Sequence, residues 1–426
     1  MGVMSHSVDQ GCYPGAMNTF ATIILAALLL EYTLGVVGSL LNLRSLGSEL
    51  PGEFQGTYDQ EKYAKSQNYT KARTRFSLVE STFSLAVMLA FWFAGGFPWL
   101  DAWVRAFEWG PILTGLVFMM ALMVPLKLLN LPFQLYSTFV LEERFGFNRM
   151  DAKTFWTDQF KGIVLGGLLG GGLMAAILVF FEKTGDSAWL WCWGTTTLVS
   201  LVAMFVAPTW IMPLFNTFTT LDEGSLRDRI LGYAKSVSFP LEGLFVIDGS
   251  KRSTKANAFF TGFGKNKRIA LYDTLIDAQS EDELVAVVAH EIGHYKRKHV
   301  LQGLVIAILH FGLLFWLLSI FMGKQELFQA FGVENVSNYA GLVFFGLLYT
   351  PIEMVLSVVM SAFSRKNEFE ADAFAASTTG QPEDLVEALK KLSKDNLSNL
   401  TPHPFYVWMH YSHPPVLDRI AALRAG

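Results

Sequence analysis

The chain has 426 residues, of which 52% are hydrophobic and only 16% are charged. Soluble domains carry about 25% charged residues, so this composition favours a membrane protein over a string of soluble domains. The net charge of -4 argues against a nucleic-acid partner. The two cysteines, Cys12 and Cys192, lie far apart and outside any metal or redox spacing, so we expect no disulfide framework.

Seven mostly apolar stretches are long enough to cross a bilayer as helices, because about 20 helical residues span its hydrocarbon core. The predicted fold is therefore an all-α polytopic membrane protein. Residues 1–16 lack the features of a removable signal peptide and form an N-terminal extension. Five spans fall within residues 17–212, and two more fall within residues 301–363. The predicted spans are 18–43, 76–98, 111–131, 162–182, 188–212, 301–322 and 339–363.

The basic residues predict the orientation of these spans. Lysine and arginine concentrate between spans one and two, between spans three and four, and in the long segment 213–300. The intervening loops hold only Arg105, Lys183 and Lys324. Since cytoplasmic loops are enriched in basic residues, we expect the N-terminus outside and both the large segment and the C-terminus in the cytoplasm.

Some ionisable residues lie within the predicted spans, where an unpaired charge is costly. Glu80, Lys127 and His310 are among them, and Glu80 and Lys127 can reach the interface from helix ends. Glu31 and Glu353 lie nearer the middle of their spans and favour a polar interior. A transporter would also use such an interior, so this class of protein stays open at this point.

Residues 213–300 are predicted to form a soluble insert. Helix 225–236 and strand 243–248 come first. Two further strands, 257–263 and 268–272, are then expected to pair around the turn formed by Gly264, Lys265, Asn266 and Lys267.

The insert ends in a helix that carries a metal-binding motif. Ser280-Glu281-Asp282-Glu283 has the capping-box pattern that starts a helix, and an apolar run leads into His290-Glu291-Ile292-Gly293-His294. Two histidines four positions apart lie on one helical face and can bind one ion. Zinc lowers the pKa of a bound water to about 7, and Glu291 lies where a carboxylate can take the water proton. Gly293 leaves room beside the metal.

A catalytic zinc site needs a third protein ligand and an open fourth position. The C-terminal segment 364–426 supplies a predicted helix with Glu368, Glu370, Ala371 and Asp372. Glu368 would complete a His-His-Glu set, with Glu370 as the rival ligand. Asp372 would accept the spare ring N–H of a ligating histidine, and Ala371 would allow close helix packing. A structural zinc has four protein ligands, so this set of three disfavours a transporter with a structural metal.

The remaining histidines follow no metal-ligand spacing. His299 comes after a basic cluster and is expected at the membrane interface, and His403 and His410 are expected in loops or on the surface. His413 precedes a terminal helix that bears Arg419. On residue chemistry alone, a role in the site is open for both but is the less favoured interpretation.

Motifs spread over nearly the whole chain occur together in one known family. They are Leu131 to Phe133, Glu142 to Asn148, Pro213 to Asn216, Asp248 to Ser253, Asn257 to Phe260, Lys267 to Asp273, His290 to His294, Glu368 to Asp372 and Tyr411 to Pro415. With this combination the chain resembles the type I CAAX prenyl endopeptidases, which are integral-membrane zinc metalloproteases of the gluzincin group.

The resemblance implies a barrel of seven transmembrane helices around a large water-filled chamber, with one zinc ion per chain facing inward. It implies cleavage of the peptide bond after a prenylated cysteine, so that a C-terminal tripeptide is released. The chamber would explain Glu31 and Glu353 without transport.

The same resemblance implies roles for three more residues. His413 and Arg419 would stabilise the oxyanion, and Asn257 would contact the substrate backbone on the strand beside the zinc. The partners would be a peptide or protein substrate and the lipid bilayer, either in a bacterial inner membrane or in the endoplasmic reticulum. A membrane quality-control protease that cuts misfolded proteins is the alternative enzyme.

Overall fold

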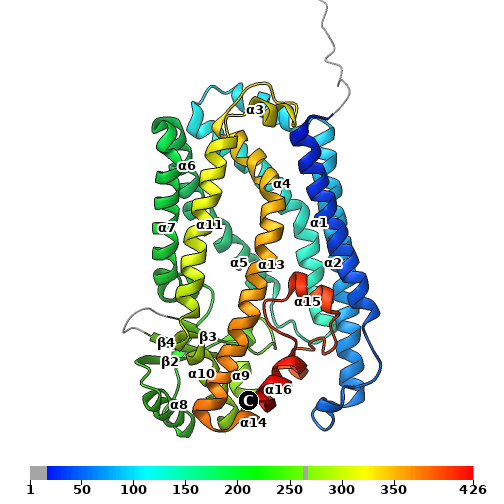
Figure 1. Cartoon of the computed structure of the whole chain (residues 1–426), viewed down its shortest axis with the longest axis vertical. Coiled ribbons are helices and arrows are strands. Elements are labelled where there is room, and N and C mark those ends of the chain that lie inside the picture. The colour runs from blue at the N-terminus through cyan, green and yellow to red at the C-terminus, as the bar shows by residue number, and fades with distance from the viewer. Residues whose placement is uncertain (1–16, 262–266, 426) are drawn as a thin grey trace, which may run out of the picture.

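The computed structural model describes residues 17–261 and 267–425, and within them seven helices are long and apolar enough to cross a membrane. Most of them run along the long axis of the molecule (Figure 1). The predicted number of spans is confirmed. The seven are Thr19–Arg44 (α1), Gln60–Phe93 (α2), Pro111–Glu142 (α4, Pro111–Tyr136, with a π-helical end), Ala152–Lys183 (α5, Ala152–Leu165, and α6, Gly171–Lys183), Gly185–Leu214 (containing α7, Ala188–Val206), His299–Phe321 (α11) and Asn338–Thr379 (α13).

These helices keep many large apolar side chains accessible, which a soluble monomer would bury. Met123, Phe160, Leu168 and Trp210 are each more than half exposed. Such a surface suits a bilayer, whose hydrocarbon is as apolar as the side chains themselves. Together with the lengths of the helices, it agrees with the predicted multi-pass fold.

The second span differs from its prediction at both ends. α2 begins at Gln60, where the Asp59 side chain accepts a hydrogen bond of 2.6 Å from the backbone N of Lys62. It stops at Phe93, before the predicted end at 98, because Gly95 adopts a φ of 76° that ends the helix. A short helix, α3 (Gly96–Arg105), continues the apolar sequence after the break.

The seventh span is much longer than its apolar stretch. α13 continues past residue 363 as far as Thr379, where Gly380 ends it in the left-handed conformation. One unbroken helix therefore runs from the apolar part of the molecule to Glu368 and Asp372.

An aromatic core closes the end of the bundle where α3 and α12 (Gln325–Gln329) lie, at the top of Figure 1. Phe97, Phe328, Phe331 and Phe344 are all buried there. The rings of Phe331 and Phe344 stack with centroids 4.1 Å apart. Close ring packing of this kind adds to the stability gained from burying the aromatic surface.

Three of the ionisable residues of the spans, His310, Glu353 and Glu80, have polar surroundings. His310 Nε2 of α11 lies 3.2 Å from Glu353 Oε2 of α13. Glu80 lines a cavity of about 410 Å³ between α2, α4 and α5. Both arrangements avoid leaving a charge unpaired against lipid.

A four-stranded sheet lies at the opposite end of the molecule, in the order β1-β2-β4-β3. β2 (Leu241–Ile247) and β4 (Lys267–Tyr272) are parallel, and β1 (Phe218–Thr220) and β3 (Ala258–Thr261) pair antiparallel at the two edges. The predicted pairing of the last two strands is confirmed over the residues described. Their predicted turn lies mostly outside the described residues, since Gly264, Lys265 and Asn266 fall in the gap.

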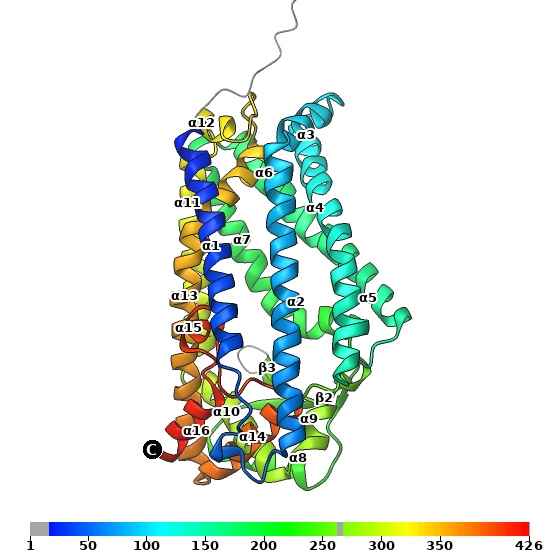
Figure 2. The same cartoon turned by 90° about the vertical axis from the view of Figure 1, so that its right-hand side faces the viewer.

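Helices at the same end surround the sheet (Figure 2). They are α8 (Ser225–Ser236), which matches its prediction, α9 (Asp273–Ala278), α10 (Glu281–Lys296), α14 (Pro382–Asp395) and α16 (Val416–Ala425), whereas α15 (Pro404–His410) packs on α1 and α13. Buried residues of α10, among them Leu284, Val288 and Ile292, form the centre of their shared core. This packing holds the metal-motif helix rigidly against α13.

Candidate metal centre

The capping box at the start of α10 forms as predicted. The backbone N of Ser280 donates to Glu283 Oε2 at 2.7 Å, and the backbone N of Glu283 donates to Ser280 Oγ at 3.3 Å. Lys391 of α14 also binds Glu283 Oε2, at 2.7 Å. These contacts fix where α10 starts, and they thereby set which residues of the helix face α13.

Gly293 and Ala371 lie where α10 and α13 cross. A Cβ atom added to Gly293 would lie 3.0 Å from the carbonyl oxygen of Ala371 and 3.1 Å from its Cα. The room at Gly293 is therefore taken up by the backbone of α13, whereas the sequence suggested room beside the metal. The close crossing brings Glu368 within reach of both histidines.

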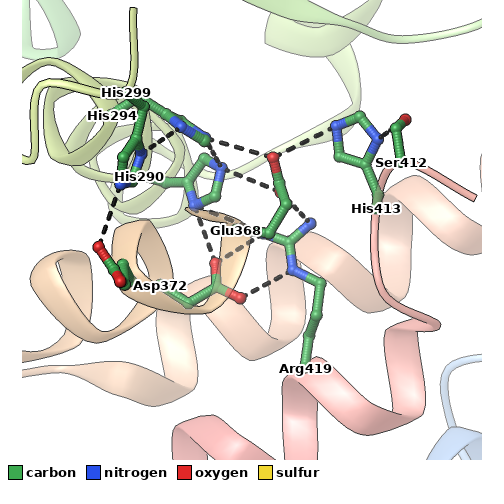
Figure 3. A network of polar contacts seen from close by, with 9 residues as sticks. His290, His294, His299, Glu368, Asp372, Ser412, His413 and Arg419 are labelled. Carbon is green, nitrogen blue, oxygen red and sulfur yellow. Dashed lines mark hydrogen bonds and ion pairs between the residues drawn. The ribbon is translucent and has the colours of Figure 1, made fainter. Parts of the chain in front are cut away.

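Three side chains from these two helices converge on one point, as Figure 3 shows. His290 Nε2 lies 3.1 Å from His294 Nε2 and 3.5 Å from Glu368 Oε2, and His294 Nε2 lies 3.3 Å from Glu368 Oε1. Ligands about 2.0 Å from a tetrahedral zinc ion are about 3.3 Å from one another. The three donor atoms therefore have the spacing of a metal site.

The carboxylate of Glu368 supports this interpretation. It is buried, and its Oε2 atom accepts no hydrogen bond from any residue that the structure describes. Arg419 Nη1 lies 3.2 Å away, but it is not aligned as a hydrogen-bond donor. A buried acceptor of this kind is costly unless it binds a cation, so the donor set fits a divalent metal.

Asp372 and Arg419 contact Nδ1 of His290, the ring nitrogen that faces away from the cluster. His290 Nδ1 lies 2.8 Å from Oδ1 of Asp372, the residue expected to accept its ring N–H. Arg419 binds the two oxygens of the same carboxylate, through Nε at 2.8 Å and Nη2 at 2.6 Å. Arg419 is 8% exposed, and these bonds orient it toward Glu368 and His290.

His299 takes a position that the sequence did not predict. It is buried rather than interfacial, and its Nδ1 lies 3.0 Å from Nδ1 of His294. Its Nε2 lies 3.2 Å from Glu370 Oε2. Glu370 thus supports His294 through His299 and is not in the three-residue cluster. Spacing gave no signal for this contact, because it depends on how α11 meets α10.

Glu291 lies next to His290 on α10. Burial raises the pKa of its carboxyl. No residue in the described ranges 17–261 and 267–425 makes a hydrogen bond or ion pair with its side chain. A carboxylate left free beside a metal site can exchange a proton with a water molecule there.

The two other predicted site residues differ in how close they come to the cluster. His413 is largely exposed, with Nε2 3.4 Å from Glu368 Oε1 and Nδ1 3.0 Å from Ser412 Oγ. Asn257 is exposed just before the edge strand β3, and its carbonyl accepts from Tyr272 N at 3.1 Å. Within the described residues it makes no hydrogen bond or ion pair with the cluster, so its proposed role depends on a substrate lying between them.

The two remaining histidines are away from the cluster. The side chain of His403 caps the start of α15, where it accepts a hydrogen bond from Phe405 N at 3.1 Å. His410 is exposed at the end of the same helix. Both positions agree with the surface locations expected from the sequence.

Comparison with known proteins identifies the family. Residues 39–217 match the family described as CAAX prenyl protease N-terminal, five membrane helices, and residues 220–426 match peptidase family M48. A rice protein named CAAX prenyl protease 1 homolog is 39% identical, over 88% of this chain and 90% of its own. The chain belongs to peptidase family M48.

Further relatives agree with this family. CAAX prenyl protease 1 of Saccharomyces cerevisiae is 35% identical over 88% of each chain. The crystal structure of Ste24p from S. mikatae has a TM-score of 0.90 at 33% identity, and covers 96% of this chain and 100% of its own. This M48 chain is accordingly a multi-pass membrane metalloendopeptidase, which uses a metal cofactor and acts on peptide or protein substrates.

Proposed function

We propose that this M48 protease uses zinc to cleave the C-terminal peptide of prenylated CAAX proteins. The observation that carries the proposal is the cluster of His290, His294 and Glu368, in a chain that aligns with CAAX prenyl proteases over most of its length. The eukaryotic relatives favour the endoplasmic reticulum membrane over a bacterial membrane. The basic loops favour an active site on the cytoplasmic side.

Two imidazole nitrogens and one carboxylate oxygen form the donor set that catalytic zinc sites use. His290 and His294 would bind through Nε2, since their Nδ1 atoms face Asp372 and His299. When bound, zinc polarises a peptide carbonyl and lowers the pKa of water. Two histidines and one carboxylate leave a fourth position open, as a catalytic site requires.

Glu291 is the proposed general base. It takes one proton from the attacking water while the water oxygen bonds to the scissile carbonyl carbon. Glu291 then passes this proton to the leaving nitrogen as the C–N bond breaks, so its carboxylate is regenerated. Its place on α10 beside His290, and the absence of a competing partner within the described residues, support this role.

His413 is the proposed oxyanion contact. Its ring is 67% exposed while one nitrogen lies 3.4 Å from Glu368, so it faces the space that a scissile carbonyl would enter. Arg419 would act with it, through the positive charge it holds next to Glu368. The loss of one such donor typically costs about 100- to 1000-fold in rate.

The edge strand β3 is the proposed platform for the peptide. β4 pairs with one side of β3, and no other described strand pairs with it. An extended peptide can add to such an edge through main-chain hydrogen bonds. Asn257 immediately precedes β3 and would bind the peptide backbone at the end of this platform.

The test is mass spectrometry of products from a farnesylated CAAX peptide and its unprenylated form, with and without a chelator. We expect release of the C-terminal tripeptide from the farnesylated peptide, and its loss with the chelator or in Glu291→Gln. Cleavage by Glu291→Gln at the wild-type rate would refute the assigned base. Cleavage of an unfolded membrane protein in place of either peptide would support the quality-control alternative.

A further inference from the structure

Arg365 lies on α13 one turn before Glu368, and its guanidinium points to a neighbouring helix. Nη1 donates to the carbonyl oxygen of Tyr411 at 2.6 Å and to that of Val407 at 3.3 Å. These carbonyls belong to the last turn of α15 and the residue that follows it. No carboxylate in the described parts of the chain pairs with Arg365. The two carbonyls are therefore the partners that the structure gives this cation.

A cation is favourable at the C-terminal end of a helix. The last carbonyls of a helix have no partner within it and carry partial negative charge. Arg365 supplies two N–H donors to α15 at this end. Val407 O also accepts the backbone N of Tyr411 at 3.1 Å, so Arg365 adds a second hydrogen bond to a carbonyl of the last turn.

α15 also contacts α1. The backbone N of His403 donates to Asn42 Oδ1 at 3.2 Å, and the rings of Phe405, Tyr406 and His410 pack around Gly38. Arg365 adds a polar link between the end of α15 and the helix that carries Glu368.

The segment that Arg365 holds leads directly to His413. Tyr411 O, which makes the shorter bond, lies only two residues before His413 in the chain. His413 Nε2 in turn lies 3.4 Å from Glu368 Oε1, one turn along α13 from Arg365. The segment from Tyr411 to His413 therefore contacts α13 at both ends, through Arg365 at Tyr411 and through Glu368 at His413. Figure 3 shows the second of these contacts.

We infer that Arg365 is a positioning residue, which keeps His413 over the metal centre by holding the end of α15 against α13. This rests on the proposed function, in which His413 contacts the oxyanion. Arg365 itself touches neither the three-residue cluster nor the space beside it. Its loss should then reduce the rate of the chemical step through His413, with little change in bound metal.

A double-mutant cycle tests this inference in the full-length protein with the farnesylated CAAX peptide. His413→Ala should lower kcat about 100-fold or more, the usual cost of a lost oxyanion donor. Arg365→Met, which keeps most of the side-chain volume, should lower kcat at least about tenfold with KM and zinc content near wild type. The double variant should stay within about twofold of His413→Ala, because residues that act as a unit are not additive.

Three results would overturn the inference while leaving the proposed function intact. They are a wild-type kcat in Arg365→Met, losses that multiply in the double variant, and loss of zinc from Arg365→Met. A wild-type kcat in His413→Ala would instead refute the proposed role of His413. Arg75→Met, at an exposed arginine of α2, is the matched control and should behave as wild type.

Arg365→Lys keeps the test valid if Arg365→Met cannot be purified. A lysine ammonium can reach one of the two carbonyls, so this variant should lose less activity than Arg365→Met. Its loss should likewise disappear in the His413→Ala background. A loss of the same size in both backgrounds would contradict the inference.

Discussion

At the scale of single residues, the Nδ1 atoms of both histidines in the cluster have partners. His290 contacts Asp372, which Arg419 holds in place, and His294 contacts His299, which contacts Glu370. Such partners fix the ring orientation and leave Nε2 as the metal ligand. The proposed site thus contains two supporting chains that differ in composition, one ending in an arginine and the other in a carboxylate.

His299 should matter for metal affinity, although it contacts no metal. We expect His299→Ala to weaken zinc binding about 10- to 100-fold, since loss of an outer partner usually has an effect of this size. Zinc titration against a competing chelator measures it. Glu370→Gln should have a smaller effect, because Glu370 contacts His299 and reaches His294 only through it. Wild-type affinity in His299→Ala would show that His294 needs no partner.

The residues of the cluster were predictable from local spacing, but their supports were only partly so. His290 and His294 come from one helix and Glu368 comes from another, and helical periodicity was enough to group them as the structure does. His299 was predicted at the membrane interface, because its contact with His294 depends on the turn between α10 and α11. The sequence did not indicate a role for Arg365, since its partners are backbone carbonyls at the end of α15.

At the scale of elements, the crossing of α10 and α13 decides whether the cluster forms. Gly293→Ala should push the two helices apart, because the added Cβ would lie 3.0 Å from a backbone oxygen. We expect a loss of stability of about 1–3 kcal/mol, typical of overpacking, together with reduced zinc binding. Thermal unfolding and metal analysis of the purified protein measure both.

Gly346→Ala provides the control for this substitution. Gly346 lies on α13 itself, and a Cβ added there meets nothing within 4 Å. Alanine is the better helix former, so this variant should be no less stable than wild type. Equal destabilisation by the two substitutions would show that the crossing is not the cause.

Element boundaries were predicted less well than element types. Hydropathy located all seven spans, but it could not show that α13 continues to Thr379, because the last part of this helix is polar and packs on α10. β1 was missed because it has only three residues and forms through pairing with β2. Hydropathy did not reveal the helix break at Gly95, because the sequence on both sides of it is apolar.

At the scale of the whole molecule, ion pairs tie the loop after α1 to the C-terminal helices. Glu53 lies 2.8 Å from Lys390 of α14 and 2.7 Å from Arg424 of α16. Arg424 also binds Glu383, at 2.8 Å. Hydropathy could not predict these ion pairs, since Glu53 lies more than 300 positions before Lys390 and Arg424 in the chain.

This network should make stability depend on acidic pH. Bonding to Lys390 lowers the pKa of Glu53, and bonding to Arg424 lowers that of Glu383. A carboxyl with a lowered folded pKa stabilises the protein above its unfolded pKa of about 4.3, and this contribution is lost as pH falls from there through the folded pKa. We expect Glu53→Gln to cost up to about 1 kcal/mol at neutral pH, and its difference from wild type to be smaller near pH 3. An equal difference at both pH values in thermal unfolding would contradict this.

The central claim is that His290, His294 and Glu368 together hold one catalytic zinc ion. The most direct measurement is the zinc content per chain of purified Glu368→Ala, compared with Glu291→Gln under the same conditions. We predict that Glu368→Ala loses its zinc, whereas Glu291→Gln keeps the metal and loses only cleavage. Full zinc content in Glu368→Ala, with loss in Glu370→Ala instead, would contradict the account.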